Sequence, residues 1–93
     1  MADTVRRKLL LSGAVQGVGF RYWAVREAGK YAVAGYVRNL PDGRVEVVLE
    51  GPPEEVARLA GVMREGPPYG RVDHVETKEE RPREDRSSFQ VEF

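Results

Sequence analysis

The hydrophobic positions of the chain change their period several times, and each change marks a new element. Residues 5–13 contain a run of three leucines, which is typical of a strand. Residues 21–31 instead place apolar side chains at helical spacing. The segments 34–40 and 44–51 are rich in β-branched residues, and the Pro-Asp-Gly turn at 41–43 joins them. These patterns predict a strand, a helix and then a β-hairpin.

The second half of the chain predicts another helix and two more strands. The helix is expected to begin at Pro53, because proline suits the first helical position and two glutamates follow it. Its apolar side chains form one stripe, and Gly66 with the two prolines after it ends the helix. Residues 71–80 predict a strand and 87–93 a short last strand, with a charged loop at 81–86 between them.

The order of these elements predicts one α+β domain over residues 1–93. A β-α-β-β-α-β order with an extra C-terminal strand is typical of the ferredoxin-like sandwich, an antiparallel sheet with both helices on one face. In that fold the first two strands run parallel and the third lies between them. The loop after the first strand should therefore lie close to Asn39, near the end of the second strand.

Composition excludes several kinds of site. The chain has no cysteine, which excludes a disulfide, a thiol nucleophile and a zinc-thiolate site. No signal peptide is recognisable, and no segment approaches the roughly 20 apolar residues of a membrane span. We therefore expect a soluble, cytoplasmic protein with no membrane partner. The sole histidine, His74, lies in a predicted strand and is expected to be structural or exposed, and the grouping of the acidic residues predicts no metal site.

The net charge is zero, but the charge is unevenly spread. Residues 1–44 carry eight basic and three acidic side chains, a net +5, so the remainder carries −5. This is either a solvated surface with chance asymmetry or a first half that binds an anion. Arg7, Lys8 and the charged run at 78–85 are expected to be solvated.

The loop between the first strand and the first helix indicates anion binding. Its sequence, GAVQGVGFRY at residues 13–22, has three glycines and one arginine but no acid. A glycine-rich loop that enters a helix N-terminus directs backbone N–H groups at one point and favours phosphate. Arg21 is unfavourable beside the positive end of the helix dipole unless an anion is bound there, and its guanidinium matches two phosphate oxygens. The alternative is that Gly17 and Gly19 only make a tight connection and that Arg21 is a surface charge.

Asn39 is the second unusual residue, because asparagine is disfavoured in strands. It shares strand parity with Gly35 and Val37. If Val37 faces the helices, Asn39 emerges beside the N-terminus of the first helix. The alternative is that Asn39 starts the turn that follows. Physical reasoning from these residues predicts an anion site on a ferredoxin-like domain.

The two motifs taken together are more specific. The run VQGVGFRYWA at 15–24 and the run GYVRNLPDGRVEVVLEG at 35–51 resemble the acylphosphatase family, and the resemblance extends over about residues 7 to 93. It implies hydrolysis of the carboxyl-phosphate bond of a small-molecule acyl phosphate to a carboxylate and inorganic phosphate, without a cofactor or metal. It also implies that Arg21 and Asn39 are catalytic. The phosphate-binding backbone it implies consists of Gln16, Gly17, Val18, Gly19, Phe20 and Arg21.

The implied chemistry needs few groups, because a carboxylate leaves without a general acid. Positioning and electrostatic stabilisation can supply most of the rate. We assign Arg21 and the loop amides to the phosphoryl oxygens and Asn39 to the attacking water. One departure from the family pattern is Ala32, where glycine is usual. A positive φ there would strain alanine by ~1–2 kcal/mol, unless the first helix closes differently.

Three alternatives to a monomeric hydrolase remain open. Ferredoxin-like sheets also stack nucleic-acid bases on exposed aromatic side chains, and Tyr36 could serve in this way. However, the strand at 44–51 has no aromatic residue and the chain is neutral, so we expect no nucleic-acid partner. A regulatory domain that kept the phosphate loop without turnover would share the motifs. So would an acylphosphatase-like module of a larger carbamoyl-transferring maturation protein.

Overall fold

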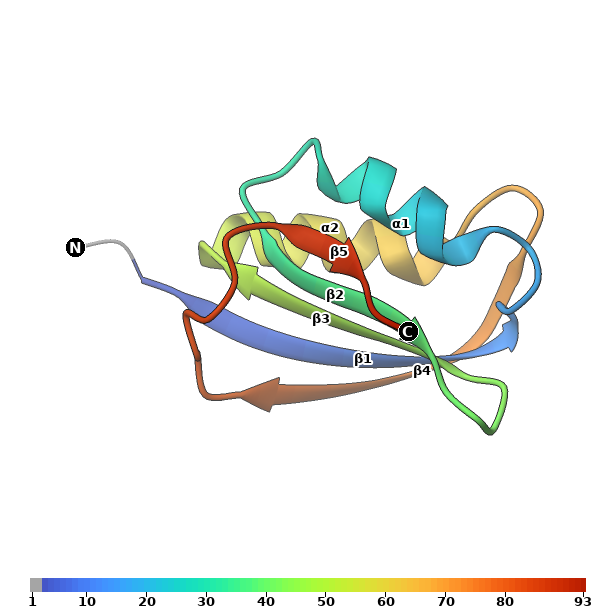
Figure 1. Ribbon diagram of the computed structural model, residues 1–93. Coiled ribbons are helices and arrows are strands. Elements are labelled where there is room, and N and C mark those ends of the chain that lie inside the picture. Colours follow the sequence, from blue (N-terminus) through green and yellow to red (C-terminus); the bar gives the residue numbers. More distant parts are fainter. Residues whose placement is uncertain (1–2) are drawn as a thin grey trace.

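The computed structural model describes residues 3–93 as a five-stranded sheet with two helices on one face (Figure 1). Residues 1–2 of the predicted domain lie outside the described residues. The elements are β1 (Val5–Ala14), α1 (Phe20–Ala28), β2 (Ala34–Asn39), β3 (Val45–Gly51), α2 (Pro53–Glu65), β4 (Arg71–Glu80) and β5 (Phe89–Val91). This order confirms the predicted α+β ferredoxin-like class.

The strand order in the sheet is β4-β1-β3-β2-β5. β3 is antiparallel to both β1 and β2, so β1 and β2 run parallel on either side of it, as predicted. β5 differs from the expected antiparallel arrangement, because it pairs with β2 in parallel and makes the sheet mixed. It is also shorter than the predicted 87–93, although the Glu92 N–H extends the pairing with a hydrogen bond to the Val37 carbonyl (2.9 Å).

The core lies between the sheet and the two helices. Val47 pairs with Leu9 on one side and with Val37 on the other, and all three are fully buried. The predicted apolar stripe of α2 packs against this sheet face and consists of Val56, Leu59, Ala60 and Met63. Burial of each large aliphatic side chain stabilises the fold by about 1.5–3 kcal/mol. This packing fixes the orientation of alternate residues along β2, including the last one.

α1 ends at Ala28, three residues before the predicted end at Tyr31. The chain tightens there, because the N–H groups of Lys30 and Tyr31 bond carbonyls three residues back instead of four. Among residues 3–93, Glu84 is the only non-glycine residue with a positive φ (52°), so Ala32 is not strained. The Ala32 N–H instead donates to the Glu55 carboxylate (3.1 Å), and the helix closes differently, as the sequence allowed.

The sheet face opposite the helices carries paired charges. Arg6 is only 2% exposed and lies 3.0 Å from the carboxylates of both Glu50 and Glu80. Lys8, on the same face, lies 3.2 Å from the Glu80 carboxylate. Arg7 has the parity of the core residue Leu9 and so lies on the helix side of the sheet, 2.8 Å from the carboxylate of Glu79. The expectation that Arg7 and Lys8 are solvated does not hold, because pairing of β1 with β4 places carboxylates beside them.

Residues 81–88 connect the two edge strands by passing across the end of the sheet (Figure 1). The Glu50 carboxylate holds this connection, because it accepts hydrogen bonds from the N–H groups of Arg83 (3.0 Å) and Glu84 (2.6 Å). Part of the charged run that the sequence presents as a solvated loop is therefore tied to a buried carboxylate. The connection delivers β5 to the free edge of β2.

Candidate functional site

The loop between β1 and α1 adopts a conformation that requires glycine. Gly17 and Gly19 have φ values of 76° and 78°, in the left-handed region. A Cβ atom added to either residue would meet nothing within 4 Å, so these positions need glycine for its backbone freedom and not for space. This sharp turn leads the chain from the end of β1 directly into α1.

The N-terminus of α1 is open to an anion. Gly19 is the N-cap residue, no side chain caps the helix, and the first turn contains no acidic residue. The first intrahelical hydrogen bond runs from the Trp23 N–H to the Gly19 carbonyl (3.0 Å). The N–H groups before Trp23 therefore have no partner within the helix, and the positive end of the dipole lies beside them.

A pocket of about 180 Å³ opens at this helix terminus. It combines residues of the glycine loop and α1 with the last residue of β2, and its lining consists of Val15, Gly17, Gly19, Phe20, Arg21, Tyr22 and Asn39. The pocket is smaller than the roughly 300–1,000 Å³ typical of sites for drug-sized ligands, and it suits a small anion. The predicted proximity of the two motifs is therefore present in the structure.

Arg21 differs from most of the other cations in the first half of the chain. Arg6, Arg7, Lys8, Lys30, Arg38 and Arg44 each lie within salt-bridge distance of a carboxylate. Within the described part of the chain, Arg21 and Arg26 form no such pair. The charge asymmetry of the sequence is thus largely neutralised by contacts with the second half. Arg21 is the cation that remains at the pocket, and its guanidinium carbon lies 5.4 Å from the centre of the Phe93 ring.

Asn39 lies where strand parity places it. Val37 is fully buried under the helices, and Asn39, two residues further on, is half-buried and lines the pocket. The turn after it is closed by other groups: the Leu40 N–H bonds the Arg44 carbonyl, and the Asp42 carboxylate accepts the Arg44 N–H. Since the turn uses these contacts, the alternative of Asn39 as a turn initiator loses its main support.

Gln16 has a contact that the sequence did not reveal. Its side-chain amide donates to the carbonyls of Leu40 (2.8 Å) and Arg44 (2.9 Å), on the two sides of the hairpin turn. This connects the glycine loop directly to the segment that follows Asn39. Gln16 and Val18, both expected among the phosphate-binding backbone, do not line the pocket. The sequence contains one sign of this contact: Gln16 has a side chain with two N–H donors in a loop of glycines and valines.

Other candidate groups lie apart from this pocket. His74 is exposed on β4, and it is not among the residues that line the pocket. Residues 3–93 contain no group of three or more side chains placed to hold a metal ion. In the same range, no helix has the length and apolar character needed to cross a membrane.

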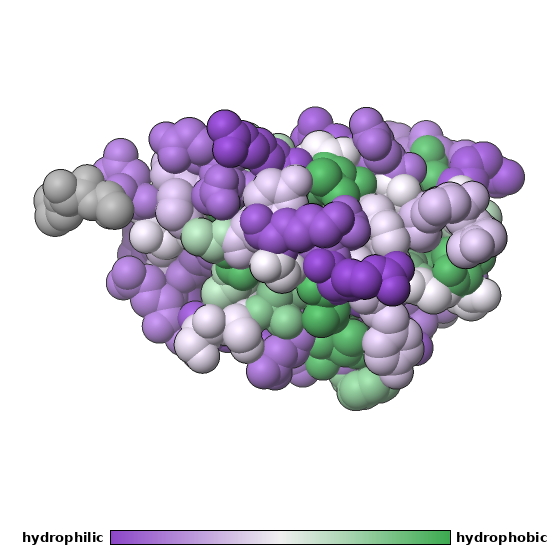
Figure 2. Space-filling view, turned by 90° about the horizontal axis from the view of Figure 1, so that it is seen from above, coloured by the Kyte–Doolittle hydropathy of each residue, from purple (hydrophilic) through white to green (hydrophobic). Residues whose placement is uncertain are grey.

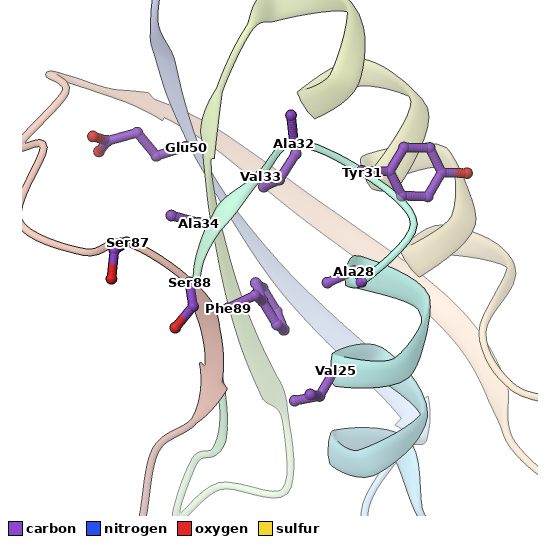
Figure 3. Close-up of a pocket in the computed structure, with 11 residues that line it drawn as sticks. Val25, Ala28, Tyr31, Ala32, Val33, Ala34, Glu50, Ser87, Ser88 and Phe89 are labelled. Carbon is purple, nitrogen blue, oxygen red and sulfur yellow. The ribbon is translucent and has the colours of Figure 1, made fainter.

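A larger depression of about 600 Å³ lies between the end of α1 and β5 (Figure 3). Val25, Ala28 and Phe89 form its apolar floor, and the Glu50 side chain points away from them. Glu50 is the one carboxylate in the lining, and it already binds Arg6 and the 81–88 connection, so it is not free for chemistry in this depression.

Comparison with known proteins gives consistent matches. The family model for acylphosphatase matches residues 7–91. An acylphosphatase from Thermococcus kodakarensis is 56% identical over 78 residues, which cover 84% of this chain and 86% of that protein. An acylphosphatase from Anaeromyxobacter dehalogenans is 46% identical over 93 residues, which cover 100% of this chain and 100% of that protein. The crystal structure of acylphosphatase from Bacillus subtilis has a TM-score of 0.90 at 35% identity, covering 96% of this chain and 99% of that one.

Proposed function

The chain belongs to the acylphosphatase family, and from this premise we propose that Arg21, Asn39 and the N–H groups of residues 16–21 form its catalytic site. Family membership makes the protein a hydrolase that acts on acyl phosphates. The observation that carries the proposal is the meeting of Arg21 and Asn39 at one small pocket, on a helix terminus with no capping side chain.

In the proposed mechanism, the phosphoryl group binds in the pocket. The guanidinium of Arg21 and the backbone N–H groups bind its oxygens and stabilise the charge that spreads over them in the transition state. The absence of a carboxylate partner for Arg21 within residues 3–93 supports this role, because no ion pair must be broken first.

The side chain of Asn39 holds the attacking water in line with the leaving group. The bond from the water oxygen to phosphorus forms while the bond from phosphorus to the carboxyl oxygen breaks. The carboxylate leaves without a proton, and the water proton passes to a phosphate oxygen. No protein base takes part. Asn39 therefore contributes by positioning the water, which can supply a large part of the barrier reduction.

The proposal extends to the state of the molecule. We propose a single domain that works as a monomer. We also propose a cytoplasmic enzyme that needs neither a metal nor a cofactor. Size-exclusion chromatography with light scattering tests the monomer, and retention of activity in a chelator tests metal independence.

The nucleic-acid alternative depended on Tyr36, and its surroundings disfavour that use. The guanidinium carbons of Arg86 and Arg38 lie 4.7 and 5.9 Å from the centre of the Tyr36 ring. The Tyr36 hydroxyl donates to the Glu46 carboxylate (2.9 Å). A ring covered in this way, beside a carboxylate, is a poor platform for a stacked base.

The test is hydrolysis of benzoyl phosphate in the presence of a chelator, together with inhibition by inorganic phosphate. We expect Arg21→Ala to lose both turnover and phosphate inhibition, with turnover reduced about 10²–10³-fold or more. Asn39→Ala should lose turnover but keep phosphate inhibition. The matched control is Arg26→Ala, since Arg26 is also an unpaired cation of α1 among the described residues but lies outside the pocket lining.

Two results would overturn the proposal. Wild-type protein that binds phosphate without hydrolysing benzoyl phosphate would indicate the regulatory alternative. Equal losses in the Arg21→Ala and Arg26→Ala variants would mean that the general positive charge of α1, and not a contact in the pocket, is responsible.

A further inference from the structure

The pocket leaves the acyl half of the substrate unaccounted for. Its volume of about 180 Å³ accommodates the phosphoryl group beside Arg21 and Asn39, but it does not enclose a larger molecule. Since the leaving group departs in line, away from the attacking water, the acyl group must extend through the mouth of the pocket. The side chains at the mouth therefore decide which acyl groups are bound well.

Exposed aromatic side chains occur at this mouth. Among residues 3–93, three large hydrophobic side chains are strongly exposed: Tyr22 (66%), Tyr69 (86%) and Phe93 (94%). Tyr22 lines the pocket, and the Phe93 ring faces the guanidinium of Arg21 at 5.4 Å. Exposed apolar side chains that lie together beside a pocket indicate a surface that binds part of a ligand.

The wider surface on the helix side is also more apolar toward the end of the molecule where the pocket lies. Figure 2 looks onto the helix layer, and apolar side chains reach the surface mainly in the middle and toward the end away from the N-terminus. The β1–α1 loop lies at that end in Figure 1. The other half of the view is mostly hydrophilic.

The cations of the β2–β3 hairpin next to Asn39 provide little for a second anionic group. Arg38 is paired with Glu46, and Arg44 is paired with Asp42. Arg26 is the exception, since it lies one turn beyond Tyr22 on α1 and pairs with no carboxylate in the described residues. A doubly anionic substrate would have to reach Arg26, whereas an apolar acyl group meets aromatic rings directly at the mouth.

We propose that Tyr22 and Phe93 form an aromatic rim that receives the acyl group and makes the enzyme prefer flat, apolar acyl phosphates to small or charged ones. This rests on the proposed function, because it requires phosphoryl binding at Arg21. Tyr22 and Phe93 determine specificity and take no part in bond breaking. Aromatic contacts of this kind contribute a factor of about 2 to 12 in an equilibrium or rate constant.

The experiment compares kcat/KM for benzoyl, acetyl and succinyl phosphate, which have an aromatic, a small and a negatively charged acyl group. The readout is the ratio of benzoyl to acetyl phosphate, because a general loss of activity cancels in it. We expect the ratio to fall by about 2- to 12-fold in Tyr22→Ala and in Phe93→Ala. Tyr22→Phe should retain the ratio, since it keeps the ring. The matched control is Tyr69→Ala, an exposed aromatic residue outside the pocket lining, and it should change neither substrate.

Several results would overturn the proposal of an aromatic rim. An unchanged ratio in Tyr22→Ala and Phe93→Ala, with both substrates affected equally, would give these rings a purely structural role. If Phe93→Ala weakened inhibition by inorganic phosphate as much as it slowed benzoyl phosphate turnover, Phe93 would serve only to orient Arg21. A preference for succinyl phosphate that Arg26→Ala abolishes would replace the rim with a second anion contact. If the wild type hydrolyses none of the three substrates, the proposed function itself fails. If it hydrolyses them with an unchanged ratio in the variants, the function stands and only the aromatic rim fails.

Discussion

The contact between Gln16 and the hairpin gives a prediction about the coupling of the two halves of the site. Gln16→Met keeps the length of an unbranched side chain and the backbone N–H but removes both amide donors. The Leu40 carbonyl still accepts the Gly43 N–H, and the Arg44 carbonyl still accepts the Leu40 N–H. No acceptor is left without a donor, so the large penalty for an orphaned buried group does not apply.

The stability loss follows from the number of bonds removed. Two neutral hydrogen bonds contribute about 0.5–1.5 kcal/mol each, and we expect the free energy of unfolding to fall by about 1–3 kcal/mol. The effect on turnover should be larger, because the glycine loop is released from the segment that positions Asn39. A displacement of the order of 1 Å reduces turnover by up to about 10²-fold. Inhibition by inorganic phosphate should change little, since the loop keeps its own N–H groups.

The assay combines urea unfolding with kcat for benzoyl phosphate and the inhibition constant of inorganic phosphate. Gln90→Met is the matched control, because within residues 3–93 the exposed Gln90 amide bonds only the nearby Ser88 hydroxyl (3.0 Å). It should leave all three quantities unchanged. If Gln16→Met lowered stability while kcat stayed constant, or weakened phosphate inhibition in proportion to kcat, the positioning argument would be refuted.

Three further predictions follow from the described contacts. Glu50→Gln should destabilise the fold by about 3 kcal/mol in urea unfolding, because it leaves the buried Arg6 with Glu80 as its one carboxylate partner and turns an amide N–H toward the donors of the 81–88 connection. Burial alone would raise the pKa of Glu50, but the N–H donors of Arg83, Arg6 and Glu84 outweigh it and hold the pKa below its ordinary value of about 4.5. This stability is present above about pH 4.5 and is lost as the pH falls through the lowered pKa. Because the pKa of Glu80 is lowered too, both proteins should lose stability in acid, and the loss should be smaller in Glu50→Gln than in wild type. Gly17→Ala should cost ~1–2 kcal/mol of stability, from its left-handed backbone, and weaken phosphate inhibition, whereas Gly61→Ala, at an exposed helical position, should do neither. The turnover of benzoyl phosphate should stay nearly flat across neutral pH, since no histidine lines the pocket, and a bell-shaped profile centred near pH 6 would contradict the mechanism without a base.

Local patterns in the sequence were sufficient for the elements and for the meeting of the two motifs. The parity of Asn39 with Val37 could be read from alternation alone, and the sheet order brings Asn39 to the glycine loop. These inferences succeed because strand period and strand order are determined by short segments and a well-known topology.

The contacts of Gln16 and the burial of Glu50 could not be predicted in the same way. Glu50 looks like the solvent-facing member of an alternating strand, and only the passage of residues 81–88 beside it makes it a buried anchor. The charge asymmetry pointed to an anion, yet pairing of β1 with β3 and β4 neutralises most of it. Partners that lie far apart along the chain leave no local period, so they remain invisible until the topology is known.

The position of β1 between β4 and β3 has a consequence for how the molecule folds. Of the four neighbouring strand pairs, only β2 with β3 joins consecutive strands. β1 can pair only after β3 and β4, which lie further along the chain, have come beside it. The hydrogen bond between Arg6 and Glu80 joins residues 74 positions apart. Such distant closures slow folding, because chain entropy is lost before the contacts form. The hairpin of β2 and β3 can assemble early with Asn39 in place, while the glycine loop arrives only when β1 docks. Recovery of catalysis during refolding should therefore coincide with the slowest step, long after the first secondary structure has formed.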